Sequence, residues 1–172
     1  MKKYSRMHPS KFSIALIFAL VFLIGPGDIV HAQDYRSAVG GRLGTYVAGS
    51  FSTFVSESGS VEVIAGITRE ANESNFIFGS FYRRHFDVTN QVPTLKWYAG
   101  IGLYINSIEE AASKSELTFL PSAIIGMEYS LEHTPVNFFI DISPYYNTKS
   151  GSDSDFDLHA NLGVRYVLST RN

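Results

Sequence analysis

The chain has 172 residues, enough for one domain of ordinary size and too few for two. A formal net charge of −2 gives no indication of a nucleic-acid partner, and the absence of cysteine excludes disulfides, thiolate metal sites and cysteine nucleophiles. With 13 Phe, 10 Tyr and 14 Gly at a mean hydropathy of +0.02, the chain is too aromatic for a disordered protein and too polar for a helical membrane protein.

Residues 1–32 have the three parts of a secretory signal peptide. Four basic side chains accompany a continuous apolar run of 14 residues, 12–25, which is short for a membrane-spanning helix. Pro26 and Gly27 interrupt the run, and Val30 and Ala32 occupy the −3 and −1 positions of a cleavage site. We predict cleavage after Ala32, which leaves residues 33–172 with 10 basic and 15 acidic side chains, a net charge of about −5. An uncleaved N-terminal anchor is the alternative.

From residue 37 onward, apolar and polar residues alternate with a period of two, which predicts strands. The pattern is clearest in 95–106, where Leu95, Trp97 and Ile101 share one face and Lys96 lies on the other. It recurs in 136–146 and 158–168. Five further strands are predicted at 37–46, 48–56, 60–69, 75–86 and 118–130. Segment 75–86 carries aromatic and charged residues on both faces, so its phase stays open, and 107–116 is interpreted as a polar loop.

Eight alternating strands fit either a soluble barrel or sandwich or a transmembrane barrel, which differ in the face that is apolar. Six charged residues fall on the face opposite the aliphatic set: Arg42, Glu62, Lys96, Glu128, Asp141 and Arg165. Seven glycines share that face: Gly40, Gly44, Gly66, Gly100, Gly102, Gly126 and Gly163. Glycine is unfavourable on a strand unless space is tight, and the lumen of a small barrel is tight. We therefore predict an all-β, eight-stranded antiparallel up-and-down transmembrane β-barrel, preceded by a cleavable signal peptide.

The direction of each strand predicts at which end of the barrel its outward aromatic residues lie. If the first strand starts in the periplasm, Trp97, Tyr129 and Tyr166 point outward near the periplasmic ends of their strands, and Phe119 and Tyr146 point outward at the opposite end. Such rings form the aromatic girdle of a membrane barrel. The same direction places the longest connections, 107–117 and 147–156, outside the cell, where an extracellular partner would bind.

The last strand resembles the C-terminal signal by which the outer-membrane assembly machinery recognises its barrels. Asn161, Gly163, Tyr166 and Leu168 match its polar, glycine and hydrophobic or aromatic positions, although Leu168 replaces the commoner phenylalanine and four residues follow it. More widely, residues 38–168 resemble the outer-membrane protein β-barrel domain family of Gram-negative bacteria in the blocks VGGRLG, KWYAGIGL, IGMEY, PVNFFIDISPY and LGVRYVL. The resemblance implies a small eight-stranded barrel located in the outer membrane, surrounded by its lipids and inserted by the barrel-assembly machinery.

Candidate chemistry is sparse. The inward charges, three of each sign, favour a structural ion-pair network over a proton or ion path or a catalytic carboxylate pair, because unpaired charge is costly in a narrow lumen. Outer-membrane lipid A deacylases are similar small barrels whose histidine and serine stand two residues apart. Here Asn161 follows His159 at that spacing, and the chain has no G-x-S-x-G motif.

Two weaker patterns remain. His85 with Arg83 and Arg84 would suit a phosphate, but we expect a solvated barrel rim there. Asp153, Asp155 and Asp157 have the spacing of a calcium loop without its glycine and its distal glutamate.

The sequence therefore indicates a small integral outer-membrane β-barrel protein with a structural or surface-interaction role. We expect a lumen filled by side chains, no general pore, and no catalytic site, metal or cofactor. The alternatives are a lipid A-modifying outer-membrane hydrolase and a soluble periplasmic barrel that binds a ligand.

Overall fold

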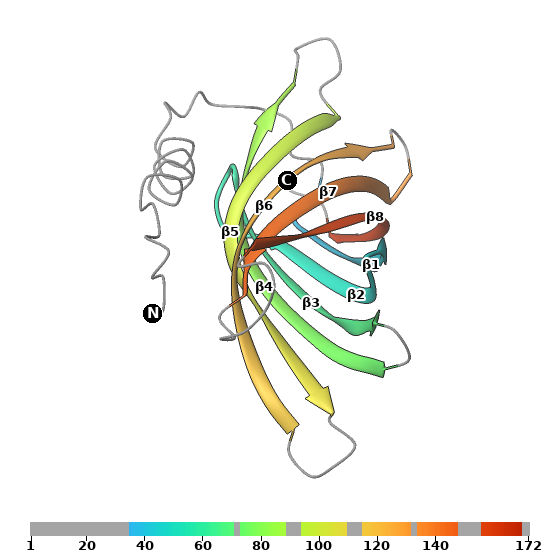
Figure 1. Ribbon diagram of the computed structural model, residues 1–172. Helices are drawn as coiled ribbons and strands as arrows, with labels where there is room; N and C mark the ends of the chain where they lie inside the picture. Colours follow the sequence, from blue (N-terminus) through green and yellow to red (C-terminus); the bar gives the residue numbers. More distant parts are fainter. Residues whose placement is uncertain are drawn as a thin grey trace, which may run out of the picture.

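The computed structural model describes residues 35–70, 73–88, 94–109, 115–131, 134–147 and 156–169. They form one antiparallel sheet that closes into a barrel (Figure 1). The strands are β1 (Ser37–Gly44), β2 (Tyr46–Phe54), β3 (Gly59–Glu70), β4 (Glu73–Asp87), β5 (Leu95–Glu109), β6 (Ser115–Ser130), β7 (Val136–Tyr146) and β8 (Phe156–Ser169). Each strand pairs with the next and β8 returns to β1, so the predicted eight-stranded up-and-down barrel is confirmed. The signal peptide predicted at 1–32 lies outside the described residues.

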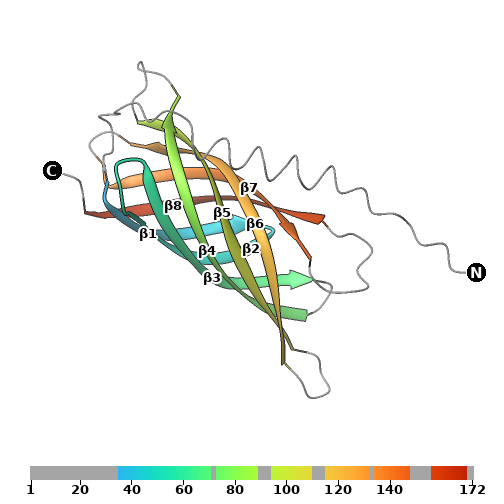
Figure 2. The same cartoon turned by 90° about the vertical axis from the view of Figure 1, so that its left-hand side faces the viewer.

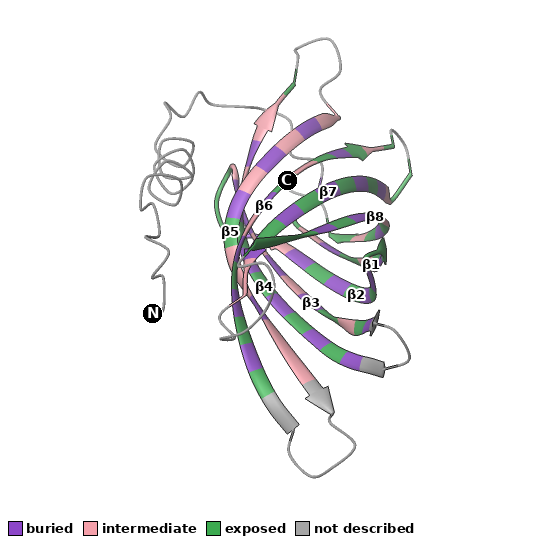
Figure 3. Ribbon diagram, viewed as in Figure 1, coloured by how far each residue is buried: buried purple, intermediate pink, exposed green. Residues whose placement is uncertain are grey.

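Burial alternates along every strand, as Figure 3 shows for the two faces of the sheet. The outward face carries large apolar side chains such as Ile140, 60% exposed, and Leu162, 58% exposed. The inward face carries the buried polar and charged residues together with tyrosines and glycines. Period-two patterning therefore assigns each residue to the lumen or to the outer surface, because neighbouring side chains on a strand point to opposite faces.

Strand β4, which the sequence left unphased, has a defined orientation. Ile77, Gly79, Phe81, Arg83 and His85 are buried in the lumen, and the residues that alternate with them face outward. The prediction of a solvated rim around Arg83 and His85 is wrong, since their exposed fractions are 0% and 5%. The ladder to β3 reaches Arg84 and the ladder to β5 reaches Asp87, so the C-terminal part of β4 belongs to the barrel wall.

The polar loop predicted at 107–117 is shorter than expected. Ser107 on β5 pairs with Leu117 on β6, and the ladder continues to Glu109 and Ser115, because the backbone groups of the two strands satisfy one another. The hairpin of β5 and β6 reaches beyond the neighbouring strands (Figures 1 and 2). The connection predicted at 147–156 is also shorter, because Phe156 already belongs to β8. Residues 110–114 and 148–155 lie outside the described part of the chain.

Glycines make room for large inward residues directly across the strand pairs. Four pairs join a glycine to an aromatic residue: Gly79 with Tyr104, Gly102 with Phe81, Gly126 with Tyr98 and Gly163 with Phe139. In each, a Cβ on the glycine would lie between 2.3 and 2.9 Å from the ring of its partner. The glycines thus let the aromatic rings lie flat against the wall, which is how a narrow lumen accommodates them.

Candidate functional site

The centre of the lumen is a carboxylate surrounded by three guanidinium groups. Glu62 on β3 is paired with Arg165 Nη2 at 2.6 Å, Arg83 Nη1 at 2.9 Å and Arg42 Nη2 at 3.0 Å. The arginines come from β8, β4 and β1, so the ion pairs connect β3 to its neighbour β4 and, across the lumen, to the first and last strands. All four side chains are fully buried.

Two further carboxylates complete the charge balance. Asp141 accepts hydrogen bonds from Tyr98 Oη at 2.9 Å and from Arg42 Nη2 at 3.2 Å. Glu128 accepts from Tyr35 Oη at 3.0 Å and from Arg165 Nη1 at 3.4 Å, and His85 Nε2 lies 3.5 Å away. Three arginines thus face three carboxylates, which is the arrangement that makes buried charge tolerable.

Aromatic rings insulate this network. The centroid of Phe139 lies 3.8 Å from the guanidinium carbon of Arg165 and 4.9 Å from that of Arg42. Tyr98 presents its ring to Arg83 at 4.8 Å. These cation–π contacts cover the guanidinium faces that hydrogen bonds cannot reach.

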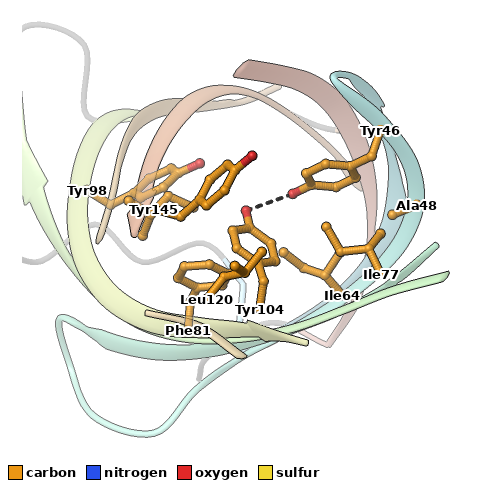
Figure 4. Packing of buried hydrophobic residues seen from close by; sticks show 10 residues of the cluster. Tyr46, Ala48, Ile64, Ile77, Phe81, Tyr98, Tyr104, Leu120 and Tyr145 are labelled. Carbon is orange, nitrogen blue, oxygen red and sulfur yellow. Dashed lines mark hydrogen bonds between the residues drawn. The ribbon is translucent and has the colours of Figure 1, made fainter. Parts of the chain in front are cut away.

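A layer of tyrosines lies next to the network. Arg42 donates to Tyr46 Oη at 2.9 Å. The hydroxyls of Tyr46 and Tyr104 are 3.0 Å apart (Figure 4), and Tyr104 Oη lies 2.8 Å from Ser143 Oγ. Ile64, Ile77, Phe81, Leu120 and Ile124 fill the space around these rings. The lumen at this level is therefore occupied by side chains.

His159 belongs to the tyrosine layer. Its ring stacks on Tyr145 at 4.4 Å and meets Tyr46 and Tyr104 edge to face at 5.1 and 5.0 Å. Neither ring nitrogen has a hydrogen-bond partner among the described residues. Asn161, which stands where a deacylase-like serine would be expected, is also buried on the lumen face.

At the opposite end of the lumen lies Tyr35, the residue that leads into β1. Tyr35 is fully buried against Phe54, Ala38 and Val167, and its ring meets Phe54 edge to face at 5.2 Å. Burial, reinforced by the neighbouring carboxylate of Glu128, raises the pKa of Tyr35 well above its ordinary value. The phenol therefore stays protonated and donates to Glu128 at neutral pH.

The structure places all six sequence-selected charges in the lumen but brings together only five of them. Arg42, Glu62, Glu128, Asp141 and Arg165 share the central network. Lys96 lies nearer one end, with its ammonium 3.9 Å from Asp87 Oδ1. Arg83, which sequence reasoning did not assign to the lumen, provides the third guanidinium group around Glu62.

The predicted girdle residues face outward. Tyr129 and Tyr166 are 38% and 57% exposed near the ends of β6 and β8, Trp97 stacks on Phe86 at 4.4 Å, and Phe119 is 50% exposed near the start of β6. Tyr146, at the end of β7, meets Phe156 edge to face at 5.3 Å. In the predicted assembly signal, Asn161 and Gly163 face the lumen and Tyr166 and Leu168 face outward.

The described residues offer little other chemistry. No group of three or more His, Asp or Glu in this part of the chain is arranged to hold a metal ion. Of the aspartates with calcium-loop spacing, Asp157 accepts a hydrogen bond from Tyr145 Oη at 3.1 Å, and Asp153 and Asp155 lie outside the described residues. No helix in the described segments is long and apolar enough to cross a membrane.

A closed eight-stranded barrel with a charged, tyrosine-filled lumen and an apolar outer surface defines the class: the chain has the fold of the small eight-stranded outer-membrane β-barrels. It is similar to the N-terminal β-barrel domain of Pseudomonas aeruginosa OprF, with a TM-score of 0.59 and 18% identity over 78% of this chain and 98% of that one. It is also similar to Neisserial surface protein A (NspA), with a TM-score of 0.51 and 15% identity over 77% of this chain and 93% of that one. No family model and no curated protein matches the sequence.

Proposed function

We propose that the chain is an integral outer-membrane protein whose eight strands cross the bilayer and whose role is structural or surface interaction, without a general pore. The observation that carries the proposal is the distribution of charge between the two faces: large apolar side chains cover the outside, and the buried ion-pair network lies inside. A soluble barrel would require the reverse arrangement.

The outer surface supports membrane insertion. Five large apolar side chains on β1, β7 and β8 are more than 40% exposed: Val39, Leu43, Phe138, Ile140 and Leu162. The outward faces of the other strands carry similar exposed apolar residues. A bilayer removes this surface from water, and barrel closure satisfies the backbone groups that lipid cannot.

The interior supports a structural role. The ion-pair network and the tyrosine layer occupy the lumen between its two ends, and a barrel of eight strands leaves little more room than its side chains need. Opening a water-filled path would require breaking several buried ion pairs together. Solute diffusion through the lumen is therefore not expected.

The expected partners follow from this location. Outer-membrane lipids would contact the apolar surface, and the assembly machinery would read Asn161, Gly163, Tyr166 and Leu168 on β8. A surface partner would bind the connections around 107–117 and 147–156, and the first of these follows a β5–β6 ladder that extends to Glu109 and Ser115.

Three measurements test the proposal on the full chain expressed in a Gram-negative host. We expect recovery in the outer-membrane fraction, faster gel migration of the unheated than of the boiled protein, and no stepwise conductance in planar bilayers. Recovery in the soluble periplasm would instead support the ligand-binding barrel, and reproducible conductance steps would contradict the filled lumen.

The hydrolase alternative has a direct assay. Purified folded protein is incubated with labelled lipid A, and we expect no modified product, because His159 faces the tyrosine layer of the lumen and Asn161 replaces the nucleophile. Product formation that His159→Phe abolishes would establish the enzyme and overturn the structural role.

A further inference from the structure

The outer surface of the barrel carries a single charged side chain among the strand residues whose side chains the structure describes. Arg84 on β4 faces outward between Tyr82 and Phe86, which share its face. Seven of the other charged strand residues in this set are buried in the lumen: Arg42, Glu62, Arg83, Lys96, Glu128, Asp141 and Arg165. Asp87 and Asp157 lie on the same inward face near the ends of their strands, and Asp157 is exposed there. A single outward-facing cation among the apolar side chains of these strands marks a specific position.

Arg84 lies at the end of the barrel where the described chain begins and ends. It stands three residues before the end of β4 and pairs with Ala99 on β5, two residues beyond Trp97. On a membrane barrel an arginine facing lipid costs roughly 2–4 kcal/mol at the midplane and roughly 0–1 kcal/mol near the interface. Arg84 lies two residues from Trp97 on this ladder, and we therefore expect it at the headgroup side of the apolar surface, where indole rings also concentrate.

The surroundings of Arg84 are an aromatic platform. Its guanidinium carbon lies 5.8 Å from the ring centroid of Phe86, and Phe86 stacks on Trp97 at 4.4 Å with an interplanar angle of 20°. Arg84, Phe86 and Trp97 are all half-buried, so their side chains lie along the wall rather than extending into solvent. A guanidinium group held above stacked rings presents a planar set of donors that matches phosphate oxygens.

We propose that Arg84, Phe86 and Trp97 form a binding site for the phosphate of an anionic glycerophospholipid. The proposal rests on the membrane insertion proposed above. The guanidinium group donates to the phosphate oxygens while the two rings contact the upper part of the acyl chains. With the first strand starting in the periplasm, this interface is the inner leaflet, and the apolar residues around the platform make lipid the matching occupant.

Trp97 makes the site directly observable, because it is the single tryptophan of the sequence. The purified protein is reconstituted in phosphatidylcholine vesicles that contain increasing fractions of brominated phosphatidylglycerol or brominated phosphatidylcholine with identical chains. The attraction of one cation to an anionic headgroup is worth about 1 kcal/mol, which corresponds to an about fivefold higher affinity for phosphatidylglycerol than for phosphatidylcholine. We therefore expect half-maximal quenching of Trp97 at an about fivefold lower fraction of brominated phosphatidylglycerol.

Substitutions separate the site from general surface charge. Arg84→Gln is expected to reduce the preference for phosphatidylglycerol to about one. Arg84→Lys is expected to retain part of this preference, because an ammonium group keeps the charge but lacks the planar set of donors of a guanidinium group. The control is Arg36→Gln, which removes an exposed cation at the same end of the barrel and is expected to keep the full preference. Heat-modifiable migration of each variant confirms that it is folded.

The outcomes distinguish this proposal from the proposed function. Equal quenching by both brominated lipids in the native protein, or a preference that survives Arg84→Gln, would overturn the phospholipid site while leaving membrane insertion intact. Absence of quenching by either lipid would mean that the barrel does not insert, which overturns the proposed function and the site with it.

Discussion

Phe139 on β7 and Gly163 on β8 lie opposite each other inside the barrel, and the phenyl ring occupies the space that a side chain at position 163 would fill. The same ring lies against the guanidinium groups of Arg42 and Arg165. The missing Cβ of Gly163 therefore makes room for an aromatic ring that contacts two cations of the central network. Packing and electrostatics in the lumen depend on the same contact.

Gly163→Ala is expected to destabilise the barrel by about 1–3 kcal/mol, the usual cost of overpacking a well-filled core. The new Cβ would lie 2.3 Å from both Phe139 Cζ and the carbonyl oxygen of Gly41, so the ring would be displaced from its contacts with the two arginines. Urea unfolding of the reconstituted protein, followed by the loss of heat-modifiable migration, measures the change.

Gly49→Ala is the matched control. Gly49 faces outward on β2, and the nearest atoms to an added Cβ are carbonyl oxygens at 3.9 Å. We expect a change within about 0.5 kcal/mol, as for other unstrained surface positions. An equal loss of stability in both variants would show that the effect is a general one of the strand backbone and not of ring packing.

Glu62→Gln is expected to destabilise the barrel by about 3–5 kcal/mol, because removing one partner leaves buried charge uncompensated. Glu62 faces the guanidinium groups of Arg42, Arg83 and Arg165, and its loss would leave three cations with two carboxylates. The same urea titration reports the change. The control is Glu57→Gln in the exposed 55–58 turn, expected to cost less than about 1 kcal/mol.

A loss below 1 kcal/mol for Glu62→Gln would contradict a network held by its central carboxylate. Combining Glu62→Gln with Arg165→Met restores the balance of charge, and we expect the double variant to recover part of the lost stability. Recovery would assign the cost to uncompensated charge rather than to lost packing.

Alternation along the chain was sufficient to predict the fold and the inward position of Arg42, Glu62 and Arg165, because a period of two assigns each side chain to one of two faces. It could not predict which charges meet, since that depends on how the strands are staggered around the barrel. Lys96 shares the inward face but lies beside Asp87 near one end. Arg83 was missed because β4 carries large residues on both of its faces.

Hairpin length was the other property that the sequence did not indicate. Ser107 and its polar neighbours lack the alternation of a membrane strand, yet β5 and β6 continue to pair there. Backbone hydrogen bonding alone sustains a hairpin beyond the apolar band, where either face meets water. The change from apolar to polar outward residues therefore marks where the apolar outer surface ends, and the strands themselves continue beyond it.

Tyr35→Phe is expected to cost about 1–3 kcal/mol at neutral pH, because the hydrogen bond to the buried carboxylate of Glu128 is lost while the ring packing against Phe54 remains. The folded pKa of Tyr35 is raised, so its contribution is fully present below pH 10 and declines as the phenol ionises in the unfolded chain. The advantage of the native protein over Tyr35→Phe should shrink by about 1.4 kcal/mol per pH unit above 10. Urea titrations of both proteins at pH 8 and pH 11 test this, and an unchanged difference would contradict a buried neutral phenol.

His159→Phe is expected to leave stability unchanged or to raise it by up to about 1 kcal/mol, because burying polar atoms without partners is unfavourable. The ring contacts of His159 with Tyr46, Tyr104 and Tyr145 are available to a phenyl ring, and both of its ring nitrogens lack partners among the described residues. His159→Ala should instead cost about 2–4 kcal/mol, since it leaves a cavity in the tyrosine layer. Urea unfolding distinguishes the two, and a loss above 1 kcal/mol for His159→Phe would mean that the imidazole nitrogens, and not the ring alone, stabilise the lumen.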